Sequence, residues 1–281
     1  MNFMAFFIPT MNSICFNGDY YLENQPFLLA QNRGFRYGDG LFETMKVFKG
    51  NVVLKQYHFD RLFFGLDLLK IKADDIHQNE ILRRISDLCI RNACAESARV
   101  RLAVFRNETN AASYIIEATP LNKEAKELNR DGWRIDLYPH ARKSCDAFAN
   151  LKSANYLPYV MADLYAKEHA FEECLLLNYD NNICDASKAN IFLVVEGEVH
   201  TPALHQGCVN GVKRRFVIDE LKNRGINVHQ KEIKETDLLT ANEVFLTNAI
   251  NDIRWVQFYR NVEYRNDFVK SFYDEVFTTF P

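Results

Sequence analysis

The fold and the chemistry of this chain depend on residues 150–157, NLKSANYL, which join a predicted strand to a predicted helix. Residues 133–138 alternate apolar and polar side chains, which is typical of a strand. From Leu157 onward the apolar spacing becomes helical, and Ser153 or Asn155 is expected to cap that helix. Lys152 is therefore expected just ahead of a helix N-terminus.

A lysine in this position becomes a nucleophile when its amine is neutral. The unpaired N–H groups of a helix start carry partial positive charge, which disfavours a second cation. Burial of the amine would lower its pKa further. A neutral lysine amine forms a Schiff base with an aldehyde cofactor, whereas the ordinary alternative is a solvated lysine at the surface. The choice between them depends on the rest of the chain.

The composition is that of a globular protein long enough for two domains. The chain has 281 residues, of which 48% are hydrophobic and 25% charged. Its net charge of −3 gives no electrostatic case for a nucleic acid or an anionic membrane as partner. The seven cysteines are scattered and form no CxxC pair, which indicates free thiols in a reducing compartment. We therefore expect a cytoplasmic protein without a membrane span.

Two α+β domains are expected, because hairpins and helices follow one another in mixed order. Residues 1–12 are apolar, but they lack a basic region and are too short to span a bilayer. They are interpreted as an N-terminal leader or a mis-assigned start. Residues 13–122 are expected to form a small N-terminal α/β domain, and residues 132–281 a larger, β-rich C-terminal α/β domain. The charged residues 123–131 are the expected interdomain linker.

Apolar spacing also predicts the individual elements. A hairpin is expected at 13–22, and residues 32–40, NRGFRYGDG, are expected to form a loop that can approach a ligand closely. The other expected elements are a hairpin at 41–54, helices at 58–71 and 80–92, strands at 98–105, 114–118, 133–138, 174–178, 189–195, 243–247 and 252–258, and helices at 212–223, 235–241 and 268–277.

The second half contains the parts of a pyridoxal phosphate site. Lys152 supplies an amine, and Asp185 supplies a carboxylate after a turn. A helix start at Gly211 offers free N–H groups to a phosphate, and residues 248–249 follow a strand end. Such an enzyme needs a lysine for the aldehyde, a carboxylate for the ring nitrogen and an anchor for the phosphate. Each feature alone has an ordinary alternative, such as a turn aspartate or a plain helix start.

The order of these parts resembles the class IV aminotransferase-like family, the fold type IV pyridoxal phosphate enzymes. The resemblance runs from about Cys15 to Phe258 and implies a two-domain fold like that of D-amino acid aminotransferase. The matching segments are NRGFRYGDGLFET at 32–44, HFDRL at 58–62, LK at 151–152 with Asn155 and Tyr156, Asp185 with NIF at 190–192, TP at 201–202, GVKR at 211–214 and EVFLTN at 243–248.

This resemblance implies a role for each matching residue. Lys152 would form the Schiff base and shuttle the substrate proton, Arg61 would bind the phosphate, and Tyr156 would bond the phenolic oxygen. Tyr37 is expected to wall the substrate pocket, and Arg106 is the candidate for a substrate carboxylate, with a surface arginine as the alternative. The remaining cofactor contacts implied are Asp185 at the ring nitrogen and Gly211, Val212, Lys213, Asn248 and Ala249 at the phosphate.

Two residues depart from the family's pattern. Asp185 stands where the family usually has glutamate, and its shorter arm needs a closer backbone or a bridging water. Lys213 stands where the transaminases tend to have threonine. A lysine there either bonds the phosphate by charge or points to solvent and leaves the phosphate to backbone N–H groups.

Within the family, residues 209–214 and 247–249 look more like aminodeoxychorismate lyase than like the branched-chain transaminases. The lyase hypothesis implies elimination of pyruvate from 4-amino-4-deoxychorismate, which leaves 4-aminobenzoate for folate synthesis. The alternatives are a class IV aminotransferase for branched-chain or D-amino acids, and a pyridoxal phosphate-binding protein without turnover. The lyase and the aminotransferase both act on a small amino substrate, whereas the binding protein would convert no substrate.

The resemblance also implies a homodimer, in which one subunit closes the pocket of the other. No metal site is predicted from the sequence. His200 and His205 are too weak a pair for one, because no helix places them on one face and no third ligand is evident.

Overall fold

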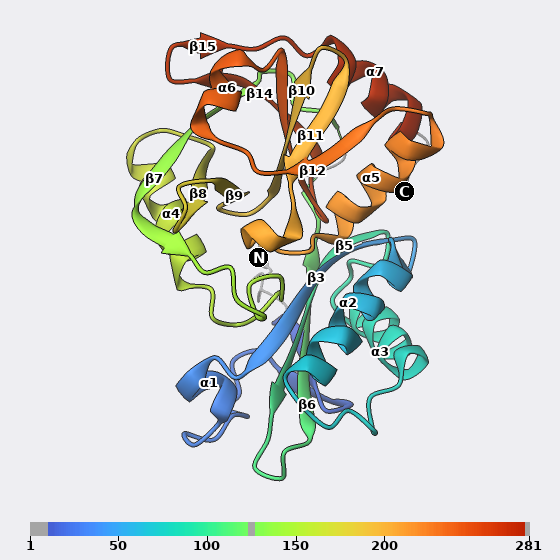
Figure 1. The fold of residues 1–281 in the computed structure, drawn as a ribbon. Coiled ribbons are helices and arrows are strands. Elements are labelled where there is room, and N and C mark those ends of the chain that lie inside the picture. The colour runs from blue at the N-terminus through green and yellow to red at the C-terminus, as the bar shows by residue number, and fades with distance from the viewer. Residues whose placement is uncertain (1–10, 123–126, 279–281) are drawn as a thin grey trace, which may run out of the picture.

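The computed structural model describes residues 11–122 and 127–278, which form two β-sheets with helices packed against them (Figure 1). The cavity described below lies between the two sheets. Residues 1–10 of the predicted leader and residues 123–126 of the predicted linker lie outside the described residues. No helix in the described part of the chain is long and apolar enough to cross a membrane.

The first sheet is antiparallel throughout, with the strand order β2-β1-β6-β5-β3-β4. The helices α2 (Lys55–Leu68) and α3 (Gln78–Arg91) pack against it. In α3, Ile81, Ile85 and Leu88 recur at helical spacing and are buried in this core. The strands are β1 (Ser13–Phe16), β2 (Asp19–Leu22), β3 (Gly40–Phe48), β4 (Asn51–Val52), β5 (Ser97–Arg106) and β6 (Ala112–Pro120).

The second sheet is mixed, with the order β12-β11-β10-β13-β14-β7-β8-β9, and β15 pairs with β14. Strand β9 also contacts β10 and β11, so the sheet curls back on itself. Its strands are β7 (Trp133–Lys143), β8 (Glu173–Asn178), β9 (Ile183–Ala186), β10 (Asn190–Val195), β11 (Glu198–Pro202), β12 (Val228–Lys231), β13 (Glu243–Asn248), β14 (Asp252–Tyr259) and β15 (Val262–Glu263).

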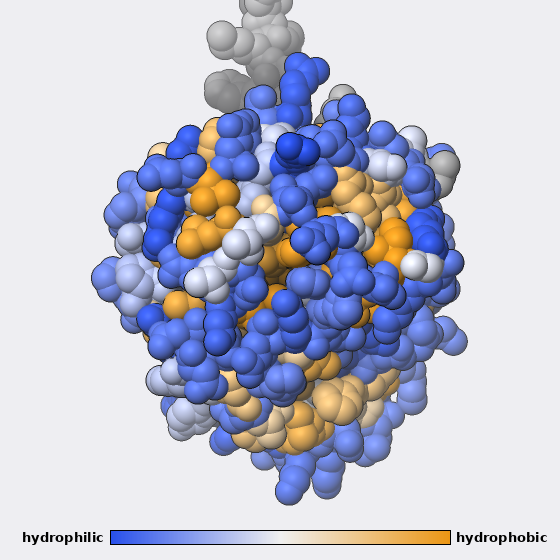
Figure 2. Space-filling model, turned by 45° about the horizontal axis from the view of Figure 1, so that its top comes forward, coloured by the Kyte–Doolittle hydropathy of each residue, from blue (hydrophilic) through white to orange (hydrophobic). Residues whose placement is uncertain are grey.

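Helices cover this sheet in two places. Helix α4 (Leu157–Glu168) packs on β7 and β8, whereas α5 (Val212–Asn223) and α7 (Asp267–Val276) pack on β13. The short helix α6 (Glu235–Thr240) precedes β13. On the face seen in Figure 2, hydrophilic side chains surround several separate apolar patches.

Most of the expected helices and strands are present, but three local expectations are wrong. Helix α4 has Tyr156 at its N-cap and no side-chain cap, so neither Ser153 nor Asn155 caps it. Part of the expected glycine-rich loop is the short helix α1 (Arg33–Tyr37), because the Asn32 side chain accepts a hydrogen bond from the N–H of Phe35. Strand β7 continues to Lys143, with a register shift, instead of ending near Tyr138.

Residues 152–154 are attached to the first sheet although they belong to the second half of the chain. The N–H of Phe42 donates to the carbonyl of Lys152 at 2.9 Å, and the N–H of Ala154 donates to the carbonyl of Gly40 at 2.9 Å. Leu41 and Ser153 form the bridge between these bonds. Strand β4 pairs only with the far end of β3, so this edge of β3 is open to the segment. The backbone of Lys152 is thereby held between the two sheets.

Replacing Gly40 by alanine is expected to destabilise the protein. An added Cβ would lie 2.5 Å from the carbonyl oxygen of Val104 and 3.0 Å from the Cα of Phe105, so backbone would have to move. We expect a loss of about 2 kcal/mol in the free energy of unfolding, measured by urea denaturation.

The control is Gly197→Ala, at a turn where φ is +83° and an added Cβ would meet nothing within 4 Å. This change should lower the free energy of unfolding by only about 1 kcal/mol, because alanine disfavours the left-handed conformation. A loss no larger for Gly40→Ala than for Gly197→Ala would contradict the tight pairing of β3 with β5.

Candidate active site

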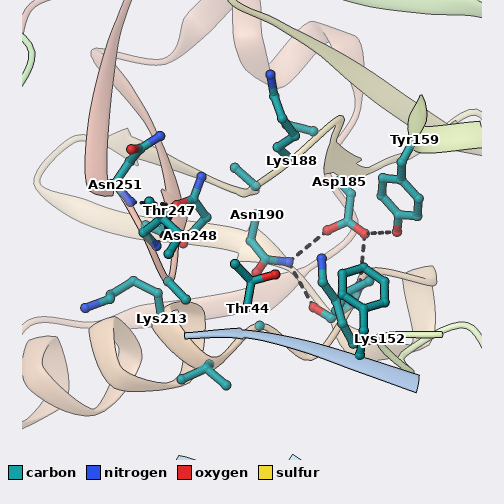
Figure 3. A pocket seen from close by; sticks show the side chains of 18 of the residues that line it. Thr44, Lys152, Tyr159, Asp185, Lys188, Asn190, Lys213, Thr247, Asn248 and Asn251 are labelled. Atoms are coloured by element: carbon teal, nitrogen blue, oxygen red, sulfur yellow. Dashed lines mark hydrogen bonds between the residues drawn. The ribbon is translucent and has the colours of Figure 1, made fainter. Parts of the chain in front are cut away.

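A cavity of about 300 Å³ lies between the two sheets and takes its walls from both. The first sheet and its helices contribute Phe42, Thr44, Arg61 and Arg99. The second contributes Lys152, the first residues of α5 and the residues after β13 (Figure 3). This volume is at the lower end of the range for small-molecule sites.

The amine of Lys152 lies inside this cavity. It is 3.0 Å from the hydroxyl of Tyr156, and it lies 4.9 Å from the ring centre of Phe42 and 4.6 Å from that of Tyr156. Burial lowers the pKa of this amine to about 8, and the charge of Arg61 acts in the same direction. The expected helix N-terminus is not the cause, because α4 begins five residues later. Lys152 therefore has a substantial neutral fraction near physiological pH.

Asp185, on β9, faces the same cavity and is 1% exposed. Its Oδ2 accepts hydrogen bonds from Lys143 at 3.0 Å, from the hydroxyl of Tyr159 at 2.7 Å and from the N–H of Val209 at 2.9 Å. Within the described residues, its Oδ1 accepts only from the amide of Asn190, at 2.8 Å. Lys152 and this carboxylate line the same cavity (Figure 3). Oδ1 thus keeps capacity for a further donor.

Lys143 is the buried counterion of Asp185, and the sequence patterns did not indicate it. Its amine bonds both Asp185 and the hydroxyl of Tyr159. The burial of Tyr159 and the nearby Asp185 raise the pKa of that hydroxyl well above its usual value, so it remains a donor. The departure from glutamate to aspartate at position 185 is therefore accompanied by a cation and a hydroxyl that fix the shorter carboxylate.

Arg61 reaches the cavity from α2 and is held by Glu43 of β3. Its guanidinium donates to both Glu43 oxygens, at 2.8 and 2.5 Å, and to the carbonyl of Asn210 at 3.1 Å. His58 bonds the same carboxylate at 2.6 Å. Burial alone would raise the pKa of Glu43, but Arg61 and His58 lower it to about 2. Glu43 is thus an ionised anchor that sequence reasoning missed.

The start of α5 forms one end of the cavity. Gly211 is the N-cap without a side-chain bond to the helix, and an added Cβ there would lie 1.8 Å from Oδ1 of Asn190. Opposite it, the turn after Thr247 is held by the side chain of Asn248, which accepts from the N–H groups of residues 250 and 251 at 3.0 and 2.8 Å.

This end of the cavity fits a phosphate. The hydroxyl of Thr247 is buried, lines the cavity and has no hydrogen-bond partner within the described residues. A helix start supplies N–H donors to an anion, and an unpaired buried hydroxyl can supply one more. With Lys152 and Asp185 at the other end, the residues present match what pyridoxal phosphate requires.

Lys213 lines the cavity, but its amine points away from Lys152 and Asp185 (Figure 3). It forms an ion pair with Asp252 at 2.6 Å, and Lys46 of β3 bonds the other oxygen of the same carboxylate. Lys213 is 1% exposed, so of the two alternatives given for it, the one in which it points to solvent is wrong. These three side chains leave one net positive charge beneath the phosphate end of the cavity.

The two residues expected to meet the substrate lie outside the cavity of this chain. Tyr37 is 59% exposed, on α1. The guanidinium of Arg106 bonds Asp39 and the carbonyl of Leu69. Arg99 lines the cavity instead, and its guanidinium has no hydrogen bond or ion pair in the described part of the chain. Thr44, Phe42 and Lys188 are further lining residues that the motifs did not indicate.

Residues 40–257 match the family described as amino-transferase class IV. The chain belongs to this family. It is therefore an enzyme of the pyridoxal-phosphate-dependent kind, either a lyase or an aminotransferase.

The relatives within the class IV aminotransferase family carry different activities. Aminodeoxychorismate lyase of Bacillus subtilis is 28% identical over 247 residues, covering 84% of this chain and 83% of that protein. D-alanine aminotransferase of Listeria innocua is 26% identical, covering 80% and 79%. The branched-chain aminotransferase structure from Thermoproteus uzoniensis has a TM-score of 0.85 at 21% identity, covering 94% and 93%. The fold is thus type IV, whereas the reaction is not decided by these similarities.

Replacing Lys152 by methionine is expected to stabilise the cofactor-free protein at neutral pH but not in alkali. The amine titrates near 10.5 when exposed and at about 8 when folded. Below about pH 8 the buried amine of the folded protein is charged, which lowers the free energy of unfolding by the full amount. Between pH 8 and pH 10.5 only the unfolded chain binds the proton, so the free energy of unfolding rises with pH. We expect a gain of about 3 kcal/mol in the free energy of unfolding at neutral pH, measured by urea denaturation.

The control is Lys222→Met, at an exposed position in the last turn of α5. Lys222→Met should change the free energy of unfolding by the same small amount at neutral pH and above pH 10.5. A gain for Lys152→Met that persists unchanged above pH 10.5 would show that the pKa of the amine is not lowered by burial.

Proposed function

We propose that this protein holds pyridoxal phosphate in the cavity between its sheets, joined through the amine of Lys152. The observation that carries the proposal is that an amine with a pKa of about 8 faces the same small cavity as a fixed, buried carboxylate. When bound, the cofactor withdraws electrons from the substrate carbon that bears the amino group. The chain's own residues bind it, orient it and move protons.

Asp185 is proposed as the partner of the ring nitrogen. Three donors hold its Oδ2, so the carboxylate cannot rotate freely, and Oδ1 has room for one more donor. Lys143, 3.0 Å from Oδ2, places a positive charge beside the carboxylate. A carboxylate fixed at the ring nitrogen favours the protonated ring, which is the stronger electron acceptor.

Arg61, the start of α5 and Thr247 are proposed to bind the phosphate. The Arg61 guanidinium is fixed by Glu43, so little side-chain entropy is lost on binding. The net positive charge of Lys46, Lys213 and Asp252 lies beneath the same end and attracts a dianion. Lys213 thereby acts through charge, while the N–H groups of Val212 and its neighbours supply the hydrogen bonds.

Lys152 is proposed as the base of the reaction. In its neutral form this amine would take the proton from the amino-bearing carbon of the substrate. Tyr156, 3.0 Å away, fixes the position of the amine, and burial keeps the Tyr156 hydroxyl protonated by raising its pKa. One residue thus serves as both attachment point and proton carrier.

The reaction we propose is that of 4-amino-4-deoxychorismate lyase. Lys152 removes the proton from the amino-bearing carbon, the bond to the enolpyruvyl oxygen breaks, and the ring becomes aromatic as 4-aminobenzoate. The enolpyruvyl group takes up the proton and leaves as pyruvate. The Bacillus subtilis relative and the sequence at 209–214 and 247–249 support this choice. Arg99, which lines the cavity, suits one carboxylate of this substrate. The product fits a role in folate synthesis.

Transamination is the alternative, favoured by the Listeria innocua and Thermoproteus uzoniensis relatives. The same Lys152 would then carry the proton between two carbons, and a keto acid would leave. A branched-chain or a D-amino acid would be the substrate. The difference lies in whether an amino acceptor is required.

A homodimer is also proposed. Helix α4 exposes Leu157, Val160, Met161 and Leu164, with fractions from 42% to 69%, which leaves an apolar face uncovered in the single chain. Such a face is typical of a subunit interface. A cytoplasmic location is proposed because the seven cysteines are free, and six of them are buried.

Purified protein is expected to be yellow and to release pyruvate from 4-amino-4-deoxychorismate without an added keto acid. The colour should change on borohydride reduction, and both colour and turnover should be lost in Lys152→Ala, because the attachment point and base are the same amine. Pyruvate is measured by a coupled assay and the cofactor by absorbance. Turnover that requires a keto acid would replace the lyase by an aminotransferase, and bound cofactor without any turnover would favour a binding protein.

Arg99→Gln is expected to raise the KM of this reaction about tenfold with little change in kcat, because it removes one cation for a substrate carboxylate. The absorbance of the cofactor should not change, since Arg99 is not proposed to touch it. Arg83→Gln, on the exposed face of α3, is the control. An unchanged KM in Arg99→Gln would remove Arg99 from the substrate site.

A further inference from the structure

Three potential metal ligands lie together on the two strands at one edge of the second sheet. Glu198 and His200 are two residues apart on β11, so their side chains share a face. His229 on β12 is the direct partner of His200 in the parallel ladder. One nitrogen from each ring and one carboxylate oxygen lie within 4.8 Å of one another. None of the three lines the cavity described above.

Their geometry suits one tetrahedral metal ion. The two ring centres are 5.1 Å apart and the ring planes are at 89°. Two imidazoles bound to one zinc ion have ring centres about 5 Å apart, given metal–nitrogen bonds of about 2.1 Å. Nε2 of His229 lies 2.8 Å from Oε2 of Glu198, so a metal ion would take the place of the proton between them.

Two further features of the neighbouring side chains favour metal binding by these residues. The other oxygen of Glu198 accepts a hydrogen bond from the amide of Asn227 at 3.1 Å, which orients the carboxylate. Nδ1 of His200 is buried and has no hydrogen-bond partner within the described residues. An unpaired buried nitrogen is unusual in a folded protein and is explained if this ring ligates an ion.

Lys231 is a cation close to the three ligands. The carboxylate of Glu198 offsets its charge, so the site as a whole does not repel a cation.

We propose that Glu198, His200 and His229 bind one divalent transition-metal ion of the zinc class, with water in the fourth position. Two imidazoles and one carboxylate are donors that zinc prefers, whereas Mg²⁺ and Ca²⁺ prefer oxygen donors alone. His205, which the sequence places near His200, is exposed and is not part of the site.

The ion would tie the edge strand β12 to β11. Arg214 of α5 bonds this strand pair, donating to the carbonyl of Pro202 at 2.8 Å and to the side chain of Gln230 at 2.9 Å. Gln230 follows His229 directly in the chain. The site is therefore placed to stabilise the strands against which the first turn of α5 is fixed.

The test is a titration of the purified holoenzyme with Zn²⁺ against a chromophoric chelator, slightly above neutral pH. All proteins carry Cys145→Ser, which removes the exposed thiol as a competing ligand. We expect one Zn²⁺ per chain, and His229→Gln should weaken binding by more than about tenfold. The matched control His205→Gln should bind like the parent protein. Absence of binding, or equal binding in all variants, would overturn the proposal.

Thermal unfolding gives a second readout that does not depend on the chelator. Zn²⁺ binds the folded site, so it should raise the Tm of the parent and of His205→Gln but not that of His229→Gln. His229 is exposed, so its replacement should leave the protein folded. Mg²⁺ should have no effect on any of them. A rise in Tm that His229→Gln retains would place the ion elsewhere.

Discussion

The active site depends on two backbone hydrogen bonds between segments that are far apart in the chain. Residues 152–154 pair with the open edge of β3, through the carbonyl of Lys152 and the N–H of Ala154. This pairing places the amine of Lys152 between the two sheets, where it is buried. The lowered pKa of Lys152 is thus a consequence of how the two halves of the chain meet. The same pairing explains why β3 supplies cavity walls at Phe42 and Thr44.

Buried charges around the cavity reinforce this arrangement. One buried ion pair crosses between the sheets, Lys46 with Asp252, and Arg61 crosses by a hydrogen bond to the carbonyl of Asn210. A buried ion pair gains little over an apolar contact, but loss of one partner is strongly destabilising. These pairs therefore contribute to the choice of one relative placement of the sheets. The three carboxylates with their cations are Glu43 with Arg61, Asp185 with Lys143, and Asp252 with Lys46 and Lys213.

Local patterns predicted the elements, and the family resemblance brought Lys152, Asp185 and Arg61 to one site, because motifs record residues that recur in order. Contacts between side chains from different helices and strands could not be predicted from the sequence. Lys143 was missed because β7 continues past Pro139 through a register shift that periodicity does not reveal. Arg106, at a strand end, was predicted to bind the substrate carboxylate, whereas Arg99 was not. The alternation of apolar and polar residues along β5 does not tell which face of the strand lines the cavity. The partner of His200 across β11 and β12 required the ladder itself.

At position 185, where the family usually has glutamate, neighbouring residues compensate for the shorter side chain of aspartate. An aspartate reaches less far than a glutamate, so the carboxylate must be placed by its backbone and neighbours. Strand β9 provides the backbone, in register with Leu176 of β8. Lys143, Tyr159 and the N–H of Val209 hold Oδ2, which leaves Oδ1 with the amide of Asn190 alone. The carboxylate keeps a fixed orientation and has the cation of Lys143 beside it, and a partner of a pyridine nitrogen needs such an orientation. The length of the side chain matters less than the donors that fix its end.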